Sequence, residues 1–405
     1  MKIVIAGDTY PPDISGASTF TSNLANGLLA RGHTVHVIAP SPIGRPYRER
    51  KDGVFEHRMR SHEYLTFRGF YLCFPWETEA TVRKILKTLQ PDVVHIQSPF
   101  TVGRVAAKLA NRLEIPLVAT NHFMPDNVMD HLPLRLPKLL LKGIANFAWE
   151  DLGSVFKRAD RLTAPSPSAA ELMRNRAKLG GILPVSCGVD IEKYQQAAKK
   201  ATPHHVPHLL FVGRLEKEKS VNEILEALAL LQPSTPLHFD IVGDGSMLDE
   251  WQSLAANLRV ADRVSFHGFL SQKELLEMFG QADIFVNASI AELQSIVTLE
   301  AMSAGKPVIL ANAVSLPHLV NHGVNGYLFQ PGDVEQLATY LEELALNPQR
   351  RKFMGKMSRE LVQAHSFEKT LDTYEGLYQG AIEDLQTSRF TLQSLSPRFS
   401  SFHQA

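Results

Sequence analysis

Two glutamates, Glu292 and Glu300, stand eight residues apart where an apolar, strand-like run gives way to a helical pattern. A carboxylate on such a helix can accept hydrogen bonds from both hydroxyls of a ribose, and one in the preceding loop can reach a sugar at the end of the sheet. Apolar neighbours of Glu300 argue against a merely solvated acid. Backbone N–H groups at a helix N-terminus bind phosphate, which here indicates Leu293, Gln294, Ser295 and Ile296.

A pair of cations, Arg214 and Lys219, follows a second strand-like run that ends at Gly213. A guanidinium binds phosphate oxygens in a bidentate way, and an ammonium adds a point charge, so the pair would suit a diphosphate. Lys219 alone equally suits a solvated helix residue beside Glu216 and Glu218. The inference therefore depends mainly on Arg214.

The loop after the first strand, Pro11–Thr19, runs through Gly16 into a helix. Small residues there let backbone N–H groups approach a phosphate, whose charge the helix dipole favours. An ordinary loop with Ser18 or Thr19 as helix N-cap explains the same residues. This loop by itself is a weak signal.

Short β-branched runs alternate with longer stretches of helical periodicity along the whole chain, which is typical of parallel sheets joined by crossover helices. The expected strands are 2–6, 34–38, 93–96, 116–120, 161–164, 208–212, 238–242, 264–266, 283–287, 307–310 and 326–329. The clearest helices are 19–31, ending at Gly32, and 221–231, 246–257, 271–280, 294–304 and 333–346. The pattern predicts an α/β fold.

The chain has 405 residues, which is too long for one ordinary core. A polar segment bounded by prolines, 195–207, is interpreted as a linker. Its histidines are interpreted as solvated, because no acid or cysteine stands near them at metal-ligand spacing. The predicted domains are 1–190 and 191–366, and the tail 386–405 is expected to be poorly ordered.

A formal net charge of zero and a pI near 7.3 argue against a nucleic-acid-binding protein. Two cysteines are too few for a disulfide scaffold, and no apolar run is long enough to span a membrane. We therefore expect a cytoplasmic protein whose membrane contact, if any, is peripheral. The first strand lacks a following G-x-G-x-x-G and the chain lacks a P-loop, which disfavours simple dehydrogenases and NTPases.

Together, the Glu292 to Glu300 segment, the Gly213 to Lys219 loop and the Pro12 to Gly16 loop resemble the retaining glycosyltransferases of family 4. The resemblance spans roughly residues 1–380 and implies the GT-B fold, two Rossmann-like domains facing each other across a cleft. It implies a helix at about 367–385 that crosses back to the first domain. It also implies transfer of a hexose from a nucleotide-diphosphate sugar, UDP-glucose or similar, to a hydroxyl.

By this resemblance, Glu300 binds the ribose and Glu292 binds the sugar hydroxyls. Arg214 and Lys219 stabilise the leaving diphosphate, the duty of a divalent cation in other transferases, and the chain has no D-x-D motif. No obligatory metal or cofactor is expected. Gly16, His122 and Asp244 complete the implied site, with His122 at the reacting side of the sugar and Asp244 in a loop common to these enzymes.

Serines replace glycines at three places in these motifs, Ser15, Ser220 and Ser295. Each adds a hydroxyl near a phosphate or sugar, so the identity of the donor stays open.

The segment 131–142 interleaves leucines with cations, like a segment that lies on an anionic bilayer. An ordinary buried helix face with solvated cations explains the pattern about as well. A second stretch, 58–71, is basic and aromatic. The cations expected to meet lipid phosphates are Arg58, Arg60, Arg135, Lys138 and Lys142.

Charge is unevenly distributed: residues 1–185 carry 24 basic and 16 acidic side chains, a net +8, and the remainder is net −8. A basic first half suits an anionic surface. The segment from Asn121 to Leu134 resembles the acceptor side of glycolipid-forming members of the family, which favours a lipid such as diacylglycerol. A soluble acceptor, a sugar-nucleotide epimerase of the same fold, or a nucleotide-sugar-binding subunit that has lost activity remain as alternatives.

Overall fold

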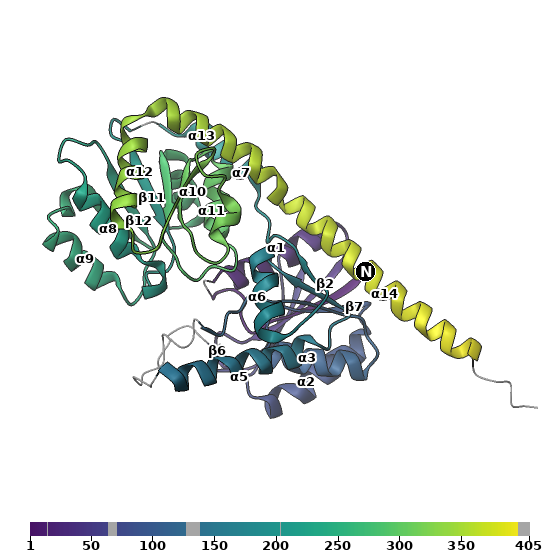
Figure 1. The fold of residues 1–405 in the computed structure, drawn as a ribbon. Coiled ribbons are helices and arrows are strands. Elements are labelled where there is room, and N and C mark those ends of the chain that lie inside the picture. The colour runs from purple at the N-terminus through teal and green to yellow at the C-terminus, as the bar shows by residue number, and fades with distance from the viewer. Residues whose placement is uncertain (14, 64–70, 127–137, 203, 396–405) are drawn as a thin grey trace, which may run out of the picture.

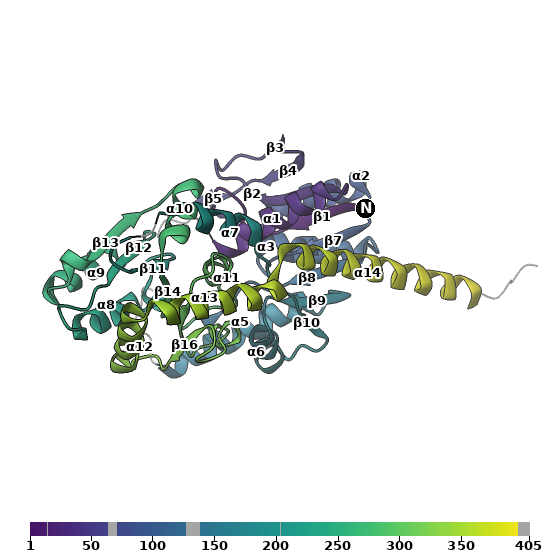
Figure 2. The same cartoon turned by 90° about the horizontal axis from the view of Figure 1, so that it is seen from above.

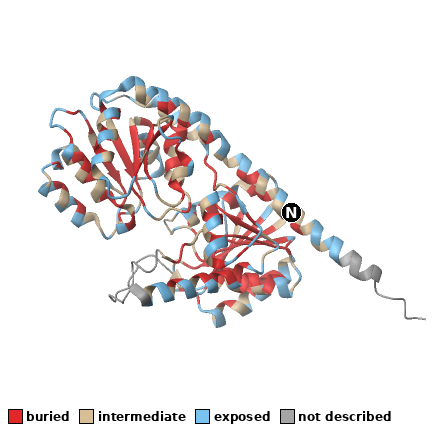
Figure 3. Ribbon diagram, viewed as in Figure 1, coloured by how far each residue is buried: buried red, intermediate tan, exposed pale blue. Residues whose placement is uncertain are grey.

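The protein forms two β-sheets, each packed between helices, in a computed structural model that describes residues 1–13, 15–63, 71–126, 138–202 and 204–395 (Figures 1 and 2). Buried positions concentrate on the strands of both sheets (Figure 3). Ile3, Val4 and Ile5 of the first strand have no exposed surface. Strands that are apolar on both faces require cover on both faces, which the helices provide.

In the described part of the chain, the N-terminal sheet has eight strands, parallel except for the pairing of β3 with β4. Their spatial order is β10 (Ile182–Pro184), β9 (Arg161–Ala164), β8 (Leu117–Thr120), β7 (Val93–Ile96), β1 (Lys2–Ala6), β2 (Thr34–Pro40), β4 (Val54–Met59) and β3 (Tyr47–Lys51). The accompanying helices are α1 (Gly16–Ala30), α2 (Pro75–Leu89), α3 (Thr101–Arg112), α5 (Lys138–Phe156) and α6 (Pro167–Ala177). Two short strands, β5 (His62–Glu63) and β6 (Tyr71–Leu72), pair antiparallel apart from this sheet.

The second sheet has six strands among the described residues, all parallel. Their order is β13 (Val264–Gly268), β12 (His238–Val242), β11 (His208–Val212), β14 (Ile284–Asn287), β15 (Val308–Ala311) and β16 (Gly326–Phe329). Its helices are α8 (Val221–Leu230), α9 (Leu248–Asn257), α10 (Gln272–Gln281), α11 (Ile296–Ser303), α12 (Val334–Leu346) and α13 (Pro348–Leu361). The predicted strands and helices of this half therefore exist, with ends shifted by a few residues.

The ends of α1 show how local chemistry sets element boundaries. The helix begins at Gly16, because the Ser15 hydroxyl accepts a hydrogen bond from the Ser18 backbone N–H. The N-cap predicted at Ser18 or Thr19 is wrong by one turn. Past the other end, Gly32 has a φ of 85°, the left-handed conformation expected of a glycine that terminates a helix.

The polar segment between the halves is mostly helical. Its first residues belong to α7 (Ile191–Lys200), in which buried Tyr194 packs edge-on against Phe279 of α10. The linker predicted from 195 is therefore wrong up to Lys200. Only one of its ten residues, Tyr194, is buried, so the apolar periodicity was too weak to reveal this helix.

Of the histidines beyond α7, His204 and His205 are exposed, as predicted, whereas His208 is partly buried. The Nδ1 atom of His208 lies 2.5 Å from the carboxylate of buried Asp240, and His267 Nε2 lies 2.7 Å from the same carboxylate. His204 stacks on His208 with ring centroids 3.7 Å apart. The acid that seemed absent comes from β12, the neighbouring strand. No group of His, Cys, Asp and Glu side chains suited to a metal ion is found among the described residues.

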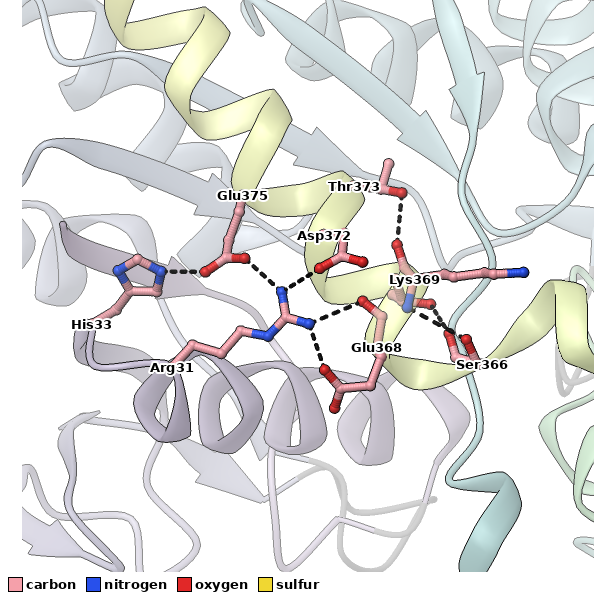
Figure 4. Close-up of polar contacts among 9 residues, drawn as sticks. Arg31, His33, Ser366, Glu368, Lys369, Asp372, Thr373 and Glu375 are labelled. Atoms are coloured by element: carbon pink, nitrogen blue, oxygen red, sulfur yellow. Dashed lines mark hydrogen bonds and ion pairs between the residues drawn. The ribbon is translucent and has the colours of Figure 1, made fainter.

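The last helix, α14 (Phe367–Leu395), returns from the second half and packs on the first (Figures 1 and 2). Leu371, Tyr374 and Tyr378 join the core of the N-terminal sheet. Arg31, at the end of α1, forms ion pairs with Glu368, Asp372 and Glu375 (Figure 4). Of the tail 386–405, expected to be poorly ordered, the part up to Leu395 is helical, and 396–405 lie outside the described residues.

Across the described ranges, none of the helices combines the length and the apolar character that crossing a bilayer requires.

Candidate active site

The predicted site residues of the second half gather where β11 and β14 end. At the end of β14, Asn287 donates a hydrogen bond to the Ser295 hydroxyl, which also accepts from the Thr298 N–H and caps α11. Ser315 donates to the backbone carbonyl of Glu292. These bonds hold the loop rigidly and place Glu292 beside the N-terminus of α11.

The carboxylate of Glu292 pairs with Lys219. Lys219 Nζ lies 2.5 Å from Glu292 Oε1, and both side chains are mostly buried, 14% and 16% exposed. An ion pair shielded from water is stronger than a surface pair. The structure therefore brings together two predicted site residues from loops 73 positions apart.

Lys219 ends a short 3-10 helix, Lys217–Lys219, and Ser220 follows it with a φ of 48°. This left-handed conformation favours glycine, which explains why the family usually has glycine there. Arg214 lies in the same loop, is 52% exposed, and contacts buried Glu218 at 3.3 Å. Both cations thus lie in the same loop, and the side chain of Arg214 is accessible to a ligand.

Glu300 lies on α11 and pairs with a residue that the sequence did not indicate. The hydroxyl of Tyr194 lies 2.5 Å from Glu300 Oε1 and donates to it. Burial raises the pKa of Glu300 to about 7, although the Tyr194 hydrogen bond and nearby Lys193 partly oppose this. Tyr194 was missed because it lies directly before the segment interpreted as a linker, in a helix that the sequence did not reveal.

The first half meets α11 through the start of α1. A side chain at Gly16 would lie 3.9 Å from Ile296 Cδ1, so the N-termini of α1 and α11 approach each other. Side-chain hydrogen bonds cross the same boundary: Ser166 donates to the Leu293 carbonyl, and Gln294 Oε1 accepts from the Cys187 N–H. The Leu293 side chain packs in the core of the N-terminal half and that of Gln294 is bonded there, so a donor role for these residues rests on their backbone N–H groups.

On the N-terminal side, His122 follows β8. Its Nε2 lies 2.9 Å from the amide oxygen of Gln97, and its ring packs 4.8 Å from that of Phe20 on α1. Burial lowers the pKa of His122 to about 4, so the imidazole is neutral at physiological pH.

Asp244 has the turn role that its position after β12 allows. It is exposed, its Oδ1 accepts from the Gly245 N–H, and its carbonyl accepts from Leu215. The loops after β11 and β12 are thereby joined, but no described contact brings the Asp244 carboxylate to Lys219 or Glu292.

One of the predicted membrane cations is misplaced. Arg58 is 4% exposed, pairs with Glu56 at 2.7 Å, and donates to the carbonyls of Pro11 and Pro40. An inward-facing arginine with three partners cannot meet lipid phosphates, so its assignment is wrong. Arg60 is 62% exposed and Lys142 is exposed, whereas Arg135 lies outside the described residues and the side chain of Lys138 is not described.

Comparison with known families shows to which family the chain belongs. Residues 14–193 match the family described as Glycosyltransferase Family 4, and residues 192–361 match the Glycosyl transferases group 1 family. The chain is a glycosyltransferase of the family 4 type. The predicted family and the predicted class of enzyme, a hexosyltransferase, are confirmed.

Curated relatives of this glycosyltransferase match over nearly its whole length. The alpha-monoglucosyldiacylglycerol synthase of Acholeplasma laidlawii is 26% identical, over 95% of this chain and 98% of the relative. The N-acetyl-alpha-D-glucosaminyl L-malate synthase of Bacillus anthracis is 25% identical, over 95% and 98%. The name of the first relative refers to a lipid and that of the second to a small acid, so the two names indicate different acceptors.

Solved structures confirm the GT-B fold of this glycosyltransferase. Sucrose-phosphate synthase from Thermosynechococcus elongatus superimposes with a TM-score of 0.76 at 18% identity, covering 95% of this chain and 100% of that one. Anabaena Alr3699/HepE in complex with UDP-glucose superimposes with a TM-score of 0.70 at 19% identity, covering 96% and 100%.

Proposed function

We propose that this glycosyltransferase moves a hexose from a nucleotide-diphosphate sugar to a lipid hydroxyl at a membrane surface, with retention of anomeric configuration. The observation that carries the donor part is the shielded Lys219–Glu292 pair beside the N-terminus of α11, with accessible Arg214 in the same loop. The cations and the positive end of the helix dipole suit the diphosphate of a nucleotide sugar, and the carboxylate suits its hydroxyls.

In this proposal, the ribose hydroxyls donate to Glu300, and the diphosphate lies at the N-terminus of α11 between Arg214 and Lys219. Glu292 accepts hydrogen bonds from the sugar hydroxyls. As the glycosidic bond breaks, charge grows on the diphosphate, and the two cations stabilise it. The acceptor hydroxyl attacks from the face that the diphosphate leaves and passes its proton to the departing phosphate oxygen, which gives retention without a covalent intermediate on Glu292. His122, in the first half, faces the sugar from the opposite side.

The donor is proposed to be UDP-glucose or a similar sugar nucleotide. The relative named for glucosyl transfer and the fold shared with a UDP-glucose complex support this choice. A screen of UDP-glucose, UDP-galactose, GDP-mannose and UDP-N-acetylglucosamine by calorimetry and donor hydrolysis tests it. We expect the UDP-hexoses to bind most tightly, and binding of GDP-mannose alone would contradict the assignment.

The roles of the two glutamates are separable. Glu292→Gln is expected to lower turnover roughly 10- to 100-fold, because one charged hydrogen bond to the sugar is lost, while the Kd of the free nucleotide diphosphate changes less than about threefold. Single-turnover kinetics and calorimetry measure the two quantities. Glu335→Gln, on the exposed face of α12, is the control. An equal loss of nucleotide affinity would show that Glu292 contacts the nucleotide instead.

The acceptor is proposed to be a membrane lipid such as diacylglycerol. Large apolar side chains are exposed on the first half: Trp76 is 74% exposed, Phe147 is 71% and Leu140 is 50%. Phe74 stacks on Trp76 with centroids 4.7 Å apart at the start of α2. Aromatic rings and leucines insert among acyl chains, while Arg60 and Lys142 on the same basic half suit lipid phosphates.

Several cations of the first half lie in ion pairs: Glu79 of α2 pairs with Arg83, Lys108 and Arg112, and Arg60 itself lies 3.7 Å from Glu77. The contact with lipid is proposed for the side of the first half where β6 and the start of α5 lie (Figure 1).

Flotation with liposomes tests the acceptor surface. The protein is expected to float with anionic vesicles and to be released by salt, because each cation near the surface contributes about 1 kcal/mol. Arg135→Glu/Lys138→Glu should lower binding by roughly tenfold or more. The matched control is Lys352→Glu/Lys356→Glu, two exposed lysines of α13 in the other half.

Indifference to vesicle charge would instead favour a soluble acceptor, the class that the malate synthase relative represents. A sugar-nucleotide epimerase remains the alternative from another class, and it would return the nucleotide to one sugar without any acceptor. Product analysis with and without a lipid extract separates the two, since only a transferase yields a new lipid glycoside.

A further inference from the structure

A chain of buried polar side chains runs from His122 into the core of the first half. His122 Nε2 lies 2.9 Å from Gln97 Oε1, and the amide nitrogen of Gln97 lies 3.1 Å from His95 Nε2. His95 Nδ1 in turn lies 2.7 Å from the hydroxyl of Tyr378 on α14. Gln97, His95 and Tyr378 are at most 2% exposed. Polar groups at this depth persist where their hydrogen bonds are satisfied.

The side-chain amide of Gln97 determines which ring nitrogen of His122 carries the proton. A glutamine side-chain oxygen only accepts hydrogen bonds, so the ring nitrogen that faces it must carry a proton. A neutral imidazole has one N–H, and here Nε2 holds it, which leaves the lone pair on Nδ1.

We propose that Gln97 is a positioning residue that holds His122 as the Nε2–H tautomer, so that Nδ1 accepts a hydrogen bond from a substrate hydroxyl. The inference rests on the proposed function, which places His122 beside the donor sugar. Phe20 packs against the ring of His122 at 4.8 Å and restricts its rotation.

The support behind Gln97 comes from the returning helix. Tyr378 contacts His95 directly, and Tyr374 lies 3.0 Å from Thr120, whose hydroxyl is 2.7 Å from His95 Nε2. Because α14 enters from the second half, the orientation of His122 depends on a segment that leaves the donor-binding half. Gln97 is therefore one link between the crossing helix and the reaction centre.

The test compares Gln97→Leu, which removes the acceptor at similar size, with Gln97→Glu, which keeps an acceptor oxygen. We expect Gln97→Leu to lower kcat roughly tenfold with the donor KM changed less than about twofold, the loss of one buried hydrogen bond. Gln97→Glu should recover most of that kcat. Tyr378→Phe should lower kcat by roughly threefold, and Tyr327→Phe, another buried tyrosine bonded to a partner, is the control.

The tautomer is measured directly by nitrogen-15 NMR of labelled histidine in the full-length protein. In the wild type and in Gln97→Glu, we expect His122 to carry its proton on Nε2. In Gln97→Leu, we expect a mixture of the two tautomers. An unchanged kcat together with an unchanged Nε2–H tautomer in Gln97→Leu would overturn the inference. A wild-type protein without transfer activity would contradict the proposed function, while the tautomer measurement would still decide the role of Gln97.

Discussion

Arg214→Ala is expected to lower kcat/KM by roughly 30- to 1,000-fold, equivalent to about 2–4 kcal/mol of lost transition-state stabilisation. The guanidinium would otherwise bind the departing diphosphate in a bidentate way, a geometry that an ammonium cannot reproduce. Arg214→Lys keeps the charge but loses the bidentate bond, so its activity should be intermediate. Steady-state kinetics with a saturating acceptor measure the effect.

The control for Arg214 is Lys217→Ala, which removes an exposed cation from the same loop. Because Arg214 contacts buried Glu218, the thermal midpoint of Arg214→Ala should be compared with that of the wild type to separate folding from catalysis. Activity should persist in excess chelator. Chelator inhibition that magnesium reverses would contradict transfer stabilised by these cations alone.

Glu300→Gln is expected to weaken the binding of nucleotide diphosphate by about 1.5–3 kcal/mol, roughly 10- to 150-fold, because ribose hydroxyls donate more strongly to a carboxylate than to an amide. With a pKa of about 7, Glu300 is half protonated near neutral pH. Wild-type affinity should therefore rise as pH increases from 6 to 8, and this rise should disappear in Glu300→Gln. Calorimetry across this range measures both effects.

The same substitution should stabilise the fold at high pH. The folded pKa of Glu300, about 7, lies above its ordinary value of 4.5, so the folded state binds more protons between these values. The free energy of unfolding of the wild type therefore falls as pH rises through this window. Glu300→Gln removes that loss, which should be on the order of 3 kcal/mol at pH 8 and absent below pH 4.5. A lower thermal midpoint than the wild type at pH 8 would show that the carboxylate is well solvated.

Much of the fold was predictable because the strands are short, apolar and buried on both faces. The predicted bounds of β1, β7, β9 and β11 are those of the structure. The edge strand β3, with the sequence YRERK, is polar and exposed, so no apolar run announced it. Its antiparallel pairing with β4 depends on the neighbouring strand rather than on its own residues.

Side-chain environments were less predictable than elements. Arg58 and Arg60 are alike in sequence, yet Arg58 lies within β4 and is buried against Glu56, whereas Arg60 lies beyond the end of this strand and is exposed. Tyr194 and Gln97 carried no local signal, because each acquires its role from a partner more than twenty residues away. Asp240 likewise meets His208 only because β11 and β12 pair.

The amino-acid sequence by itself determined the alternation of strands and helices, the loops that end in Arg214, Lys219 and Glu292, and hence the family and its GT-B fold. These properties are local, since periodicity and motif spacing are written along the chain. Only the tertiary structure decided that Lys219 pairs with Glu292 and that the Tyr194 hydroxyl donates a hydrogen bond to Glu300. It also decided that buried polar contacts run from α14 to Gln97 and His122. Such contacts join distant segments, and their burial sets the charge and pKa of each group in a way that no local pattern records.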